Sequence, residues 1–446
     1  MNQFDAKLAP SIARLVPTLA LALLLGGSPL PAAAQTLGEA AKLALETNPS
    51  VRAQREQLSI SREGYIQARS ALFPNVNAQV SVDTDRPKPA PFGYPVNHSE
   101  VGVGLTQPLY AGGRTVAGMR AAKAQIEASR EQVNDSEQGL LQDVISAYTQ
   151  VMLSERSVVI YGENVDALRK YLERVSAQRA AGDITQTDVA QAQTQLAAAE
   201  GTLAQVRANL EANRASYQAI IGEPAGTLIT PPPLDALLPP SLDAAAAAAD
   251  AGNPRVRQAL QAELAARAQV SQARGARLPT VNLTASHAAT DTAAFDKGPQ
   301  FLGSDRATNA AITATVPLFA GGYISSRIRQ AERNDAIAAD DVENARRDAR
   351  RQVLSAWGQM DSARVRLRQG EAQITAAQLA VQGMNEEYGA GTRATYEVLN
   401  AEQELRNAEI SLETARRDAY LANAGLLAAS GRLSPDVLSG AAVAQK

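Results

Sequence analysis

The feature that most limits how this chain can fold is an internal duplication. Four markers in the first half of its 446 residues recur in the second half in the same order. The first two pairs are offset by 205 residues (253 − 48) and the last two by 209 (317 − 108), so one loop is longer in the second half. Chance would not keep such an order, and the chain is therefore expected to contain two copies of one structural unit. The paired segments are 48–51 with 253–256, 71–77 with 276–282, 108–113 with 317–322, and 181–189 with 390–398.

Each half is predicted to form a helix, two strands and two further helices, in that order. The first helix runs from Pro49 to Leu72 and stops before Pro74, because proline does not continue a helix. Apolar and polar residues then alternate, which is the period of a strand with one apolar face, and membrane β-strands show this pattern. The alternating segments are 76–82, 101–105, 281–285 and 312–316.

Two long segments without proline follow the strands, from Arg114 to Ala181 and from Tyr323 to Ala390. At 1.5 Å per residue, each would make a helix of about 100 Å. Helices of this length indicate a coiled coil or a helical tube rather than a globular core. Heptad repeats follow, which support the same interpretation. The heptad residues are Leu196, Leu203, Leu210 and Tyr217 in the first half, and Val398, Leu405, Leu412, Ala419 and Leu426 in the second.

The number of predicted strands has a consequence for assembly. One chain supplies four, whereas closed membrane barrels of a single chain begin at eight strands. Four strands in lipid would leave two bare edges, and each unpaired backbone group there costs several kcal/mol. Two copies would close only a narrow barrel filled with side chains, whereas three copies would form twelve strands around a lumen. A trimer is therefore expected.

The N-terminus carries the pattern of a secretory signal peptide. The basic residues Lys7 and Arg14 precede an apolar run from Leu15 to Leu25. Small residues then lead to an expected cleavage site after Ala34. The run is shorter than the ~20 residues of a spanning helix, so export is favoured over a membrane anchor. The predicted organisation is a signal peptide (1–34), a first repeat (35–222), a Pro-rich linker (223–242), a second repeat (243–433) and a C-terminal tail (434–446).

Composition excludes several classes of function. The net charge is −3 and the basic residues are scattered among carboxylates, which argues against nucleic acid as a partner. No cysteine is present, which excludes disulfides, thiolate metal sites and a thiol nucleophile. His98 and His287 are expected near loops or strand ends and lack metal-ligand spacing. Trp357 is expected to pack in a helical core. No enzyme activity, metal or cofactor is predicted.

These markers together resemble the TolC family of outer-membrane channel-tunnel proteins, and the resemblance covers essentially the whole mature chain. It rests on the duplicated Asn-Pro helix starts, the Leu-Phe-Pro and Arg-Leu-Pro helix ends, the two Pro-Leu-aromatic-Ala-Gly-Gly joints, and the turns at Gly182 and Gly391. The fold class it implies is mostly α with membrane β. Each chain would be an internally duplicated subunit of a trimeric twelve-stranded β-barrel joined to a long periplasmic α-helical coiled-coil tunnel.

The resemblance also implies a function and partners. The expected role is a passive exit duct in the outer membrane, extending into the periplasm, that carries proteins (type I secretion) or small molecules. The expected partners are two further copies of the chain, outer-membrane lipid, a periplasmic adaptor protein and an inner-membrane ABC or proton-driven transporter. The absence of cysteine removes the lipid-anchored efflux branch of the family and favours the secretion branch.

Several residues match functional positions of the family. The turns at Gly182 and Gly391 would dock the adaptor, although glycine is also an ordinary helix terminator. Glu397 matches a ring of carboxylates at the tunnel mouth, where a second acidic position is occupied by Asn400, so weak cation selectivity is expected. Four residues would form the periplasmic gate, although each of them taken alone would be interpreted as a solvated surface residue. The gate positions are Thr187, Asp188, Tyr388 and Arg393.

Other classes of protein remain as alternatives. Multidrug efflux could be the main role of the duct. An exported structural coiled coil without a barrel would explain the heptads but not the four alternating segments. A periplasmic adaptor would need lipoyl-like and barrel domains, and an enzyme would need a convergent polar pocket; the sequence indicates neither.

Overall fold

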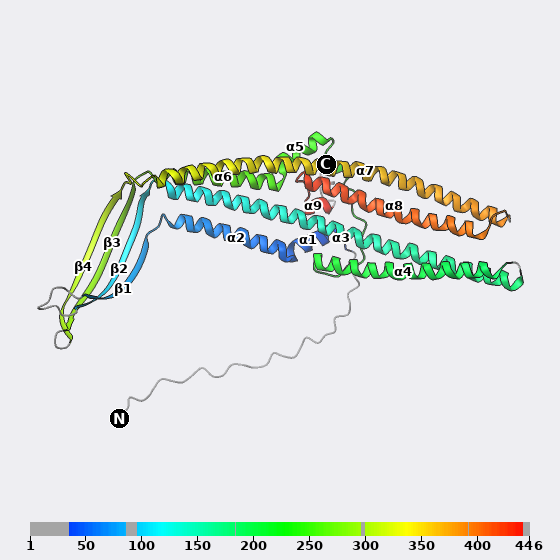
Figure 1. Cartoon of the computed structure of the whole chain (residues 1–446), viewed down its shortest axis with the longest axis horizontal. Coiled ribbons are helices and arrows are strands. Elements are labelled where there is room, and N and C mark those ends of the chain that lie inside the picture. Colours follow the sequence, from blue (N-terminus) through cyan, green and yellow to red (C-terminus); the bar gives the residue numbers. More distant parts are fainter. Residues whose placement is uncertain (1–34, 86–95, 183, 296–298, 391, 440–446) are drawn as a thin grey trace, which may run out of the picture.

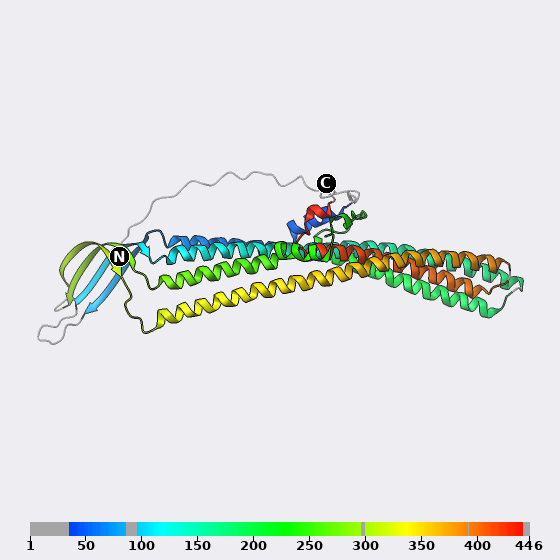
Figure 2. The ribbon, with the colours of Figure 1, turned by 90° about the horizontal axis from the view of Figure 1, so that it is seen from above.

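The computed structural model describes residues 35–85, 96–182, 184–295, 299–390 and 392–439. They form a long rod that has a β-sheet at one end and the turns of long helical hairpins at the other (Figure 1, Figure 2). The predicted signal peptide, the end of the predicted C-terminal tail and Gly391 lie outside the described residues. Within the described ranges, no helix combines the length and the apolar character that crossing a membrane requires.

The elements follow the same order in both halves. The helices are α1 (Leu37–Thr47), α2 (Pro49–Ser70), α3 (Arg114–Ala181), α4 (Gln186–Ile221), α5 (Leu242–Gly252), α6 (Pro254–Gly275), α7 (Tyr323–Gly389), α8 (Thr395–Ala429) and the short α9 (Pro435–Leu438), with a 3₁₀ turn at Asp235–Leu237 in the linker. The strands are β1 (Asn75–Asp85), β2 (Val96–Ala111), β3 (Thr280–Phe295) and β4 (Pro299–Thr315).

The strands form an antiparallel sheet in the order β1-β2-β3-β4, so β1 and β4 are its edges in the described part of one chain. Val80 lies opposite Val101, and Leu283 lies opposite Ile312, which gathers apolar side chains on one face. Val80 is 73% and Ile312 is 69% exposed in the single chain. The predicted strands are confirmed, and their apolar face is open in one copy.

Glycines bound the long helices. α3 begins after Gly113 (φ 73°) and ends before Gly182 (φ 90°), and glycine adopts this left-handed backbone without steric cost. α3 and α4 pack as one hairpin, and α7 and α8 pack as the other (Figure 1). The leucine and tyrosine positions of the α4 heptad are buried from Leu203 to Tyr217. The long helices are therefore confirmed, and α7 ends one residue before the predicted end, at Gly389.

Each half contains a short helix that the prediction lacked. α1 and α5 have 11 residues each, and the residues that cap their C-terminal ends are Asn48 and Asn253. Asn48 also begins α2, because its side-chain oxygen accepts a hydrogen bond from Ser50 N at 2.9 Å. Asn253 does the same for α6 at Arg255 N, 3.0 Å away. An asparagine that starts one helix can also end the preceding one. The prediction of a single helix before the strands is therefore wrong, because each half has two helices there.

A buried cluster midway along the rod ties the N-terminal segment and the linker to α3 and α4. The Tyr148 hydroxyl lies 2.8 Å from the Gln35 carbonyl oxygen and 2.6 Å from that of Ile229, and it accepts the Ile229 N–H at 2.9 Å. Tyr217 donates to Gln35 Oε1 at 2.7 Å. Burial raises the pKa of Tyr148 to about 12. A second buried cluster joins α5, α6, α7 and α8, and Trp357 packs against it as predicted.

Both histidines lie within strands. His98 is near the start of β2, and its Nδ1 is 3.2 Å from Thr292 Oγ1. His287 lies in the middle of β3, with Nδ1 2.8 Å from Thr308 Oγ1. The predicted position near a loop or strand end is therefore wrong for His287, because β3 continues through small residues well beyond the alternating segment 281–285.

Candidate functional site at the helical ends

The predicted site residues that the structure describes lie at the end of the rod farthest from the sheet, at the turns of the two hairpins (Figure 1). At the first turn, Gly182 N donates to the Arg179 carbonyl oxygen at 3.1 Å, and open space surrounds the glycine. This geometry is a glycine helix terminus on an exposed surface. At the second turn, Gly391 lies outside the described residues, and α8 resumes at Thr395.

Asp188 closes the first turn of α4. Its Oδ2 accepts hydrogen bonds from Thr185 N at 3.0 Å and from Thr185 Oγ1 at 2.8 Å. Asp188 N donates in return to Thr185 Oγ1 at 3.3 Å, which completes a capping box. Thr187 lies between these two residues and is exposed. The carboxylate at this position therefore already has a structural role in its own hairpin.

Arg393 connects the two helices of the second hairpin. Its Nε donates to Glu387 Oε2 at 2.7 Å, and its Nη1 donates to Glu397 Oε1 at 3.1 Å. Glu397 also accepts Ala394 N at 3.0 Å, which caps α8 from its third position as Asp188 caps α4. The hydrogen bond to Glu387, and then the one to Glu397, raise the pKa of Arg393 above its ordinary value. The Arg393 side chain is exposed, so solvent screens both pairs.

A single chain brings some of the predicted residues together and leaves others apart. Arg393 and Glu397 are in contact, and Thr187 and Asp188 share the first turn of α4. Among the described residues, no hydrogen bond or ion pair joins Asp188 to Arg393, and Tyr388 is half-buried near the end of α7. A gate that links the two hairpins therefore needs neighbouring chains and stays a prediction.

Two residues of this site were absent from the prediction. Thr185 carried a usable signal, because a threonine three residues before an acidic residue at a helix start is a capping-box pattern. Glu387 carried none. It lies six residues before Arg393, and the two meet only because the chain reverses between them.

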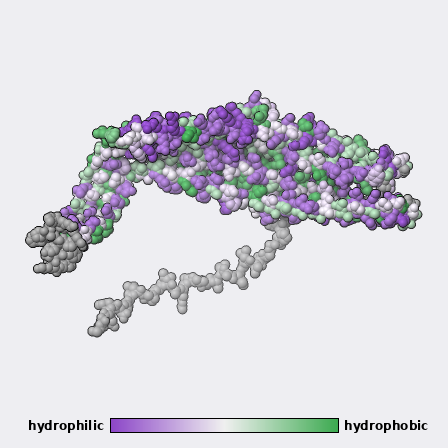
Figure 3. Space-filling view, in the orientation of Figure 1, coloured by the Kyte–Doolittle hydropathy of each residue, from purple (hydrophilic) through white to green (hydrophobic). Residues whose placement is uncertain are grey.

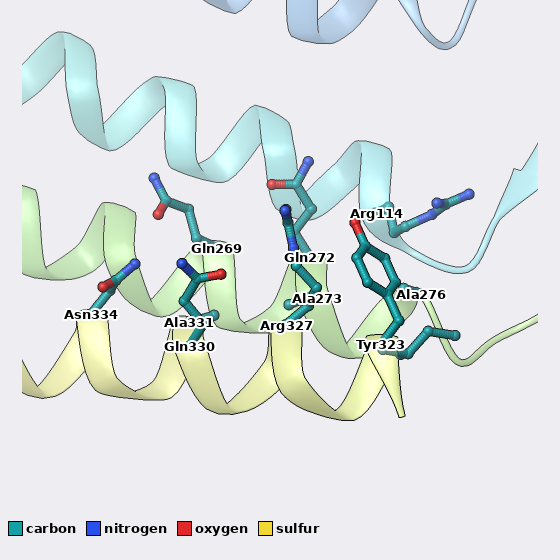
Figure 4. A pocket seen from close by; sticks show the side chains of 11 residues that line it. Arg114, Gln269, Gln272, Ala273, Ala276, Tyr323, Arg327, Gln330, Ala331 and Asn334 are labelled. Carbon is teal, nitrogen blue, oxygen red and sulfur yellow. The ribbon is translucent and has the colours of Figure 1, made fainter. Parts of the chain in front are cut away.

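A pocket of about 450 Å³ lies between α3, α6 and α7 close to the sheet (Figure 4). The amide side chains of Gln269, Gln272 and Asn334 lie between the three helices there. The other polar residues of the lining are Arg114, Tyr323, Arg327 and Gln330. The lining has no carboxylate or histidine, so it suits water and polar solutes and offers no acid–base pair. Across the described ranges, no group of three or more His, Cys, Asp or Glu side chains could hold a metal ion.

Comparison with known proteins gives a consistent result. The family model described as outer membrane efflux protein matches residues 40–223 and again 246–432. The outer membrane efflux protein BepC of Brucella suis is 32% identical over 430 residues, which cover 96% of this chain and 92% of BepC. Outer membrane protein TolC of Escherichia coli is 25% identical over 94% of this chain and 87% of its own length. The alkaline protease secretion protein AprF of Pseudomonas aeruginosa is 26% identical over 84% and 80%.

The fold is also that of solved membrane channels. CusC, which was crystallised to follow its folding and transmembrane channel formation, superposes with a TM-score of 0.76 and 18% identity. The match covers 92% of this chain and 95% of CusC. The predicted fold class, mostly α with membrane β in a channel-tunnel subunit, is confirmed.

Proposed function

The chain belongs to the outer membrane efflux protein family, and from that membership we propose that three copies form the passive exit duct of a tripartite export system. The predicted resemblance to the TolC family is confirmed. The protein is located in the outer membrane and is a channel protein rather than an enzyme. Channels of this family are trimeric and work with adaptor proteins and inner-membrane transporters.

The observation that carries the proposed stoichiometry is a sheet with open edges. In the described part of one chain, β1 and β4 each have a partner on one side only. Unpaired backbone groups cost several kcal/mol each in lipid, so the edges must be closed by other copies. Three copies supply twelve strands, enough to enclose a lumen. The 68-residue α3 then extends about 100 Å away from the membrane.

Conductance in planar bilayers tests the duct. Protein extracted from the outer membrane should insert as channels of uniform step size, and conduction should need no nucleotide. Folded protein that inserts without any conductance would contradict the proposed role.

We also propose that the helical ends form the gate between neighbouring copies, with Glu397 at the tunnel mouth and the turns at Gly182 and Gly391 as the docking surface for the adaptor. Support comes from the exposed ion pairs of Arg393, which are weak enough for a docking protein to rearrange. The proposed gate residues are Thr187, Asp188, Tyr388 and Arg393.

The cargo is either secreted protein or small molecules, and the inner-membrane transporter would select it. The relative at 32% identity is named for efflux, whereas AprF, at 26%, is named for secretion of a protease. Deleting the gene should change the secreted proteome if type I secretion is the main role, and drug susceptibility if efflux is. Unchanged secretion and unchanged susceptibility would contradict both.

A further inference from the structure

Hydrophilic residues cover most of the helical rod on the face that Figure 3 shows, with hydrophobic residues scattered among them. A small molecule with an apolar part needs more enclosure than such a mixed surface gives, and a cavity between packed elements supplies it. A cavity of about 360 Å³ lies between α3, α8 and the linker, beside the buried cluster midway along the rod. Small-molecule sites have volumes of about 300–1,000 Å³, so this cavity has room for a small ligand.

Guanidinium groups outnumber carboxylates around this cavity. Arg156 of α3 lines it, together with Arg416 and Arg417 of α8. Glu413 is the one carboxylate among the described residues that line it. Its Oε1 lies 3.0 Å from Arg416 Nη1 and 3.8 Å from Arg156 Nε, so two cations share one negative charge. Even with Arg417 paired to Asp418 at 3.2 Å, an excess of positive charge remains, which favours an anionic ligand.

Two hydrogen-bond donors on the lining residues have no partner. Arg417 Nε and the Tyr420 hydroxyl are buried atoms, and neither forms a hydrogen bond in the part of the chain that the structure describes. Burial raises the pKa of the Tyr420 phenol, so at neutral pH it stays protonated and can donate. Buried donors in proteins are satisfied by protein, water or ligand. An acceptor oxygen in the cavity would satisfy both.

The remaining wall of the cavity is apolar. Met152 and Leu153 come from α3, and Pro231 comes from the linker. Met152 and Tyr420 also pack against the buried cluster, which holds this side of the cavity in place. A cationic wall and an apolar wall thus face the same space, which suits a molecule with an acidic group on an apolar body.

The duplicated half shows that the helix itself does not require these polar side chains. Residues of α4 correspond to residues of α8 that lie 209 positions later (390 − 181). The counterparts of Arg417 and Tyr420 are Ala208 and Glu211. α4 pairs with α3 in its own hairpin without the arginine and the tyrosine. Their presence on α8 is therefore specific to the cavity.

The cavity is far from the bilayer in which the sheet would lie. Arg156 lies 42 positions after the start of α3 at Arg114 (156 − 114), which is about 60 Å along the helix at 1.5 Å per residue. Lipids of the bilayer do not reach that far, so the ligand must come from solution.

We propose that this cavity binds a small soluble organic anion, whose carboxylate or sulfonate group lies against the three arginines and whose apolar part lies against Met152 and Leu153. The acceptor oxygens take the hydrogen bonds of Arg417 Nε and the Tyr420 hydroxyl. Because both atoms are enclosed by the wall, a small rotation of the two side chains brings them to the ligand. All the lining residues belong to one chain, so the site does not depend on how many copies form the channel.

Calorimetric titration of the protein, purified from the outer membrane in a non-ionic detergent, tests the site with naphthalene-1-sulfonate, which joins an anionic group to an apolar body. One molecule should bind per chain, and the unfolding midpoint should rise with its concentration. The neutral 1-naphthalenemethanol and inorganic sulfate each supply half of this chemistry. Each should bind at least about tenfold more weakly.

Three substitutions test the named donors and charges. Arg416→Gln removes one cation, Tyr420→Phe removes only a hydroxyl group, and Arg417→Lys keeps the charge but removes the free Nε donor. Each should weaken binding of the sulfonate about tenfold, the effect of one lost hydrogen bond to a charged group. Arg207→Gln is the matched control, because Arg207 is the exposed counterpart of Arg416 on α4 (416 − 209) and lies outside the cavity. Circular dichroism should be the same for all four variants and the wild type.

The outcomes decide between the cavity and other modes of binding. Saturable binding of the sulfonate that the three cavity variants weaken and Arg207→Gln leaves unchanged would support the site. Equally tight binding of the alcohol would indicate apolar contact or partition into detergent alone, and equally tight binding of sulfate would indicate a simple anion site. Either result, an absence of binding, or wild-type affinity in all three cavity variants would overturn the proposal. Each of these failures would leave the proposed channel intact, because conductance does not depend on this ligand.

Discussion

Gly112 and Gly275 meet where the sheet joins the helices, and the backbone of each blocks a side chain on the other. A Cβ on Gly112 would lie 2.4 Å from the Gly275 carbonyl oxygen. Gly112 also has φ +63°, a left-handed conformation that costs other residues about 1–2 kcal/mol. Gly112 is thus constrained both by its close contact with Gly275 and by its backbone conformation. The neighbouring Gly113 allows the two effects to be measured separately.

Gly112→Ala should destabilise the protein by about 1–3 kcal/mol from overpacking, in addition to the backbone strain. Gly113→Ala is the matched control, because Gly113 has φ +73° but open space around it, so only the strain remains. Thermal unfolding followed by circular dichroism compares them. An equal fall in the unfolding midpoints of the two variants would show that the contact with Gly275 does not contribute to stability.

Tyr148 predicts a pH dependence. Burial raises its pKa to about 12, above the ordinary value near 10, so the folded state favours the neutral phenol. The stability that this raised pKa gives the folded state is complete below about pH 10. It is lost as the pH rises from there towards 12, because the tyrosine ionises first in the unfolded chain.

Tyr148→Phe should therefore make the unfolding midpoint fall less steeply between about pH 10 and 12. At pH 8 the lost hydrogen bonding should lower the free energy of unfolding by roughly 1 kcal/mol. The exposed Tyr396, which is 57% exposed, supplies the control variant Tyr396→Phe. Parallel pH profiles for wild type and Tyr148→Phe would contradict the assigned role.

At the scale of elements, the hairpin ends combine a capping function with a proposed gating function. Arg393→Ala removes the cation that holds Glu387 and Glu397, and should raise single-channel conductance in planar bilayers if these ends close the channel. Asp188→Ala would also remove the α4 cap. Each lost hydrogen bond should lower the free energy of unfolding by roughly 0.5–1.5 kcal/mol.

Asp188→Asn is therefore the sharper variant, because its amide oxygen can still accept from Thr185 while the charge is gone. It should raise conductance without a change in helix content, whereas Thr185→Ala should weaken the cap and leave conductance closer to wild type. Wild-type conductance in both Arg393→Ala and Asp188→Asn would contradict the gate.

The long elements could be predicted from the sequence because their signals are local. Absence of proline and the bounding glycines Gly113 and Gly182 mark α3, and two-residue alternation marks the strands. Contacts between distant segments carry no such signal. The Tyr148 hydroxyl reaches Gln35, 113 positions away, and Glu387 reaches Arg393 around a turn. The candidate gate was predicted through family resemblance. Of its local partners, Thr185 could have been found from the capping-box pattern, whereas Glu387 became visible only in the structure.

At the scale of the whole molecule, one chain leaves surfaces open that a membrane channel must close. In the described part of the chain, its sheet has two open edges and its apolar strand face is exposed. Both features are explained by the proposed assembly of three copies, in which each copy covers the open edges of its neighbours.

Native mass spectrometry of protein extracted gently from the outer membrane tests this account most directly. The expected result is a single species with three times the mass of the mature chain, which persists when the protein is diluted. A predominant monomer or dimer under conditions that preserve the fold would contradict the twelve-stranded channel.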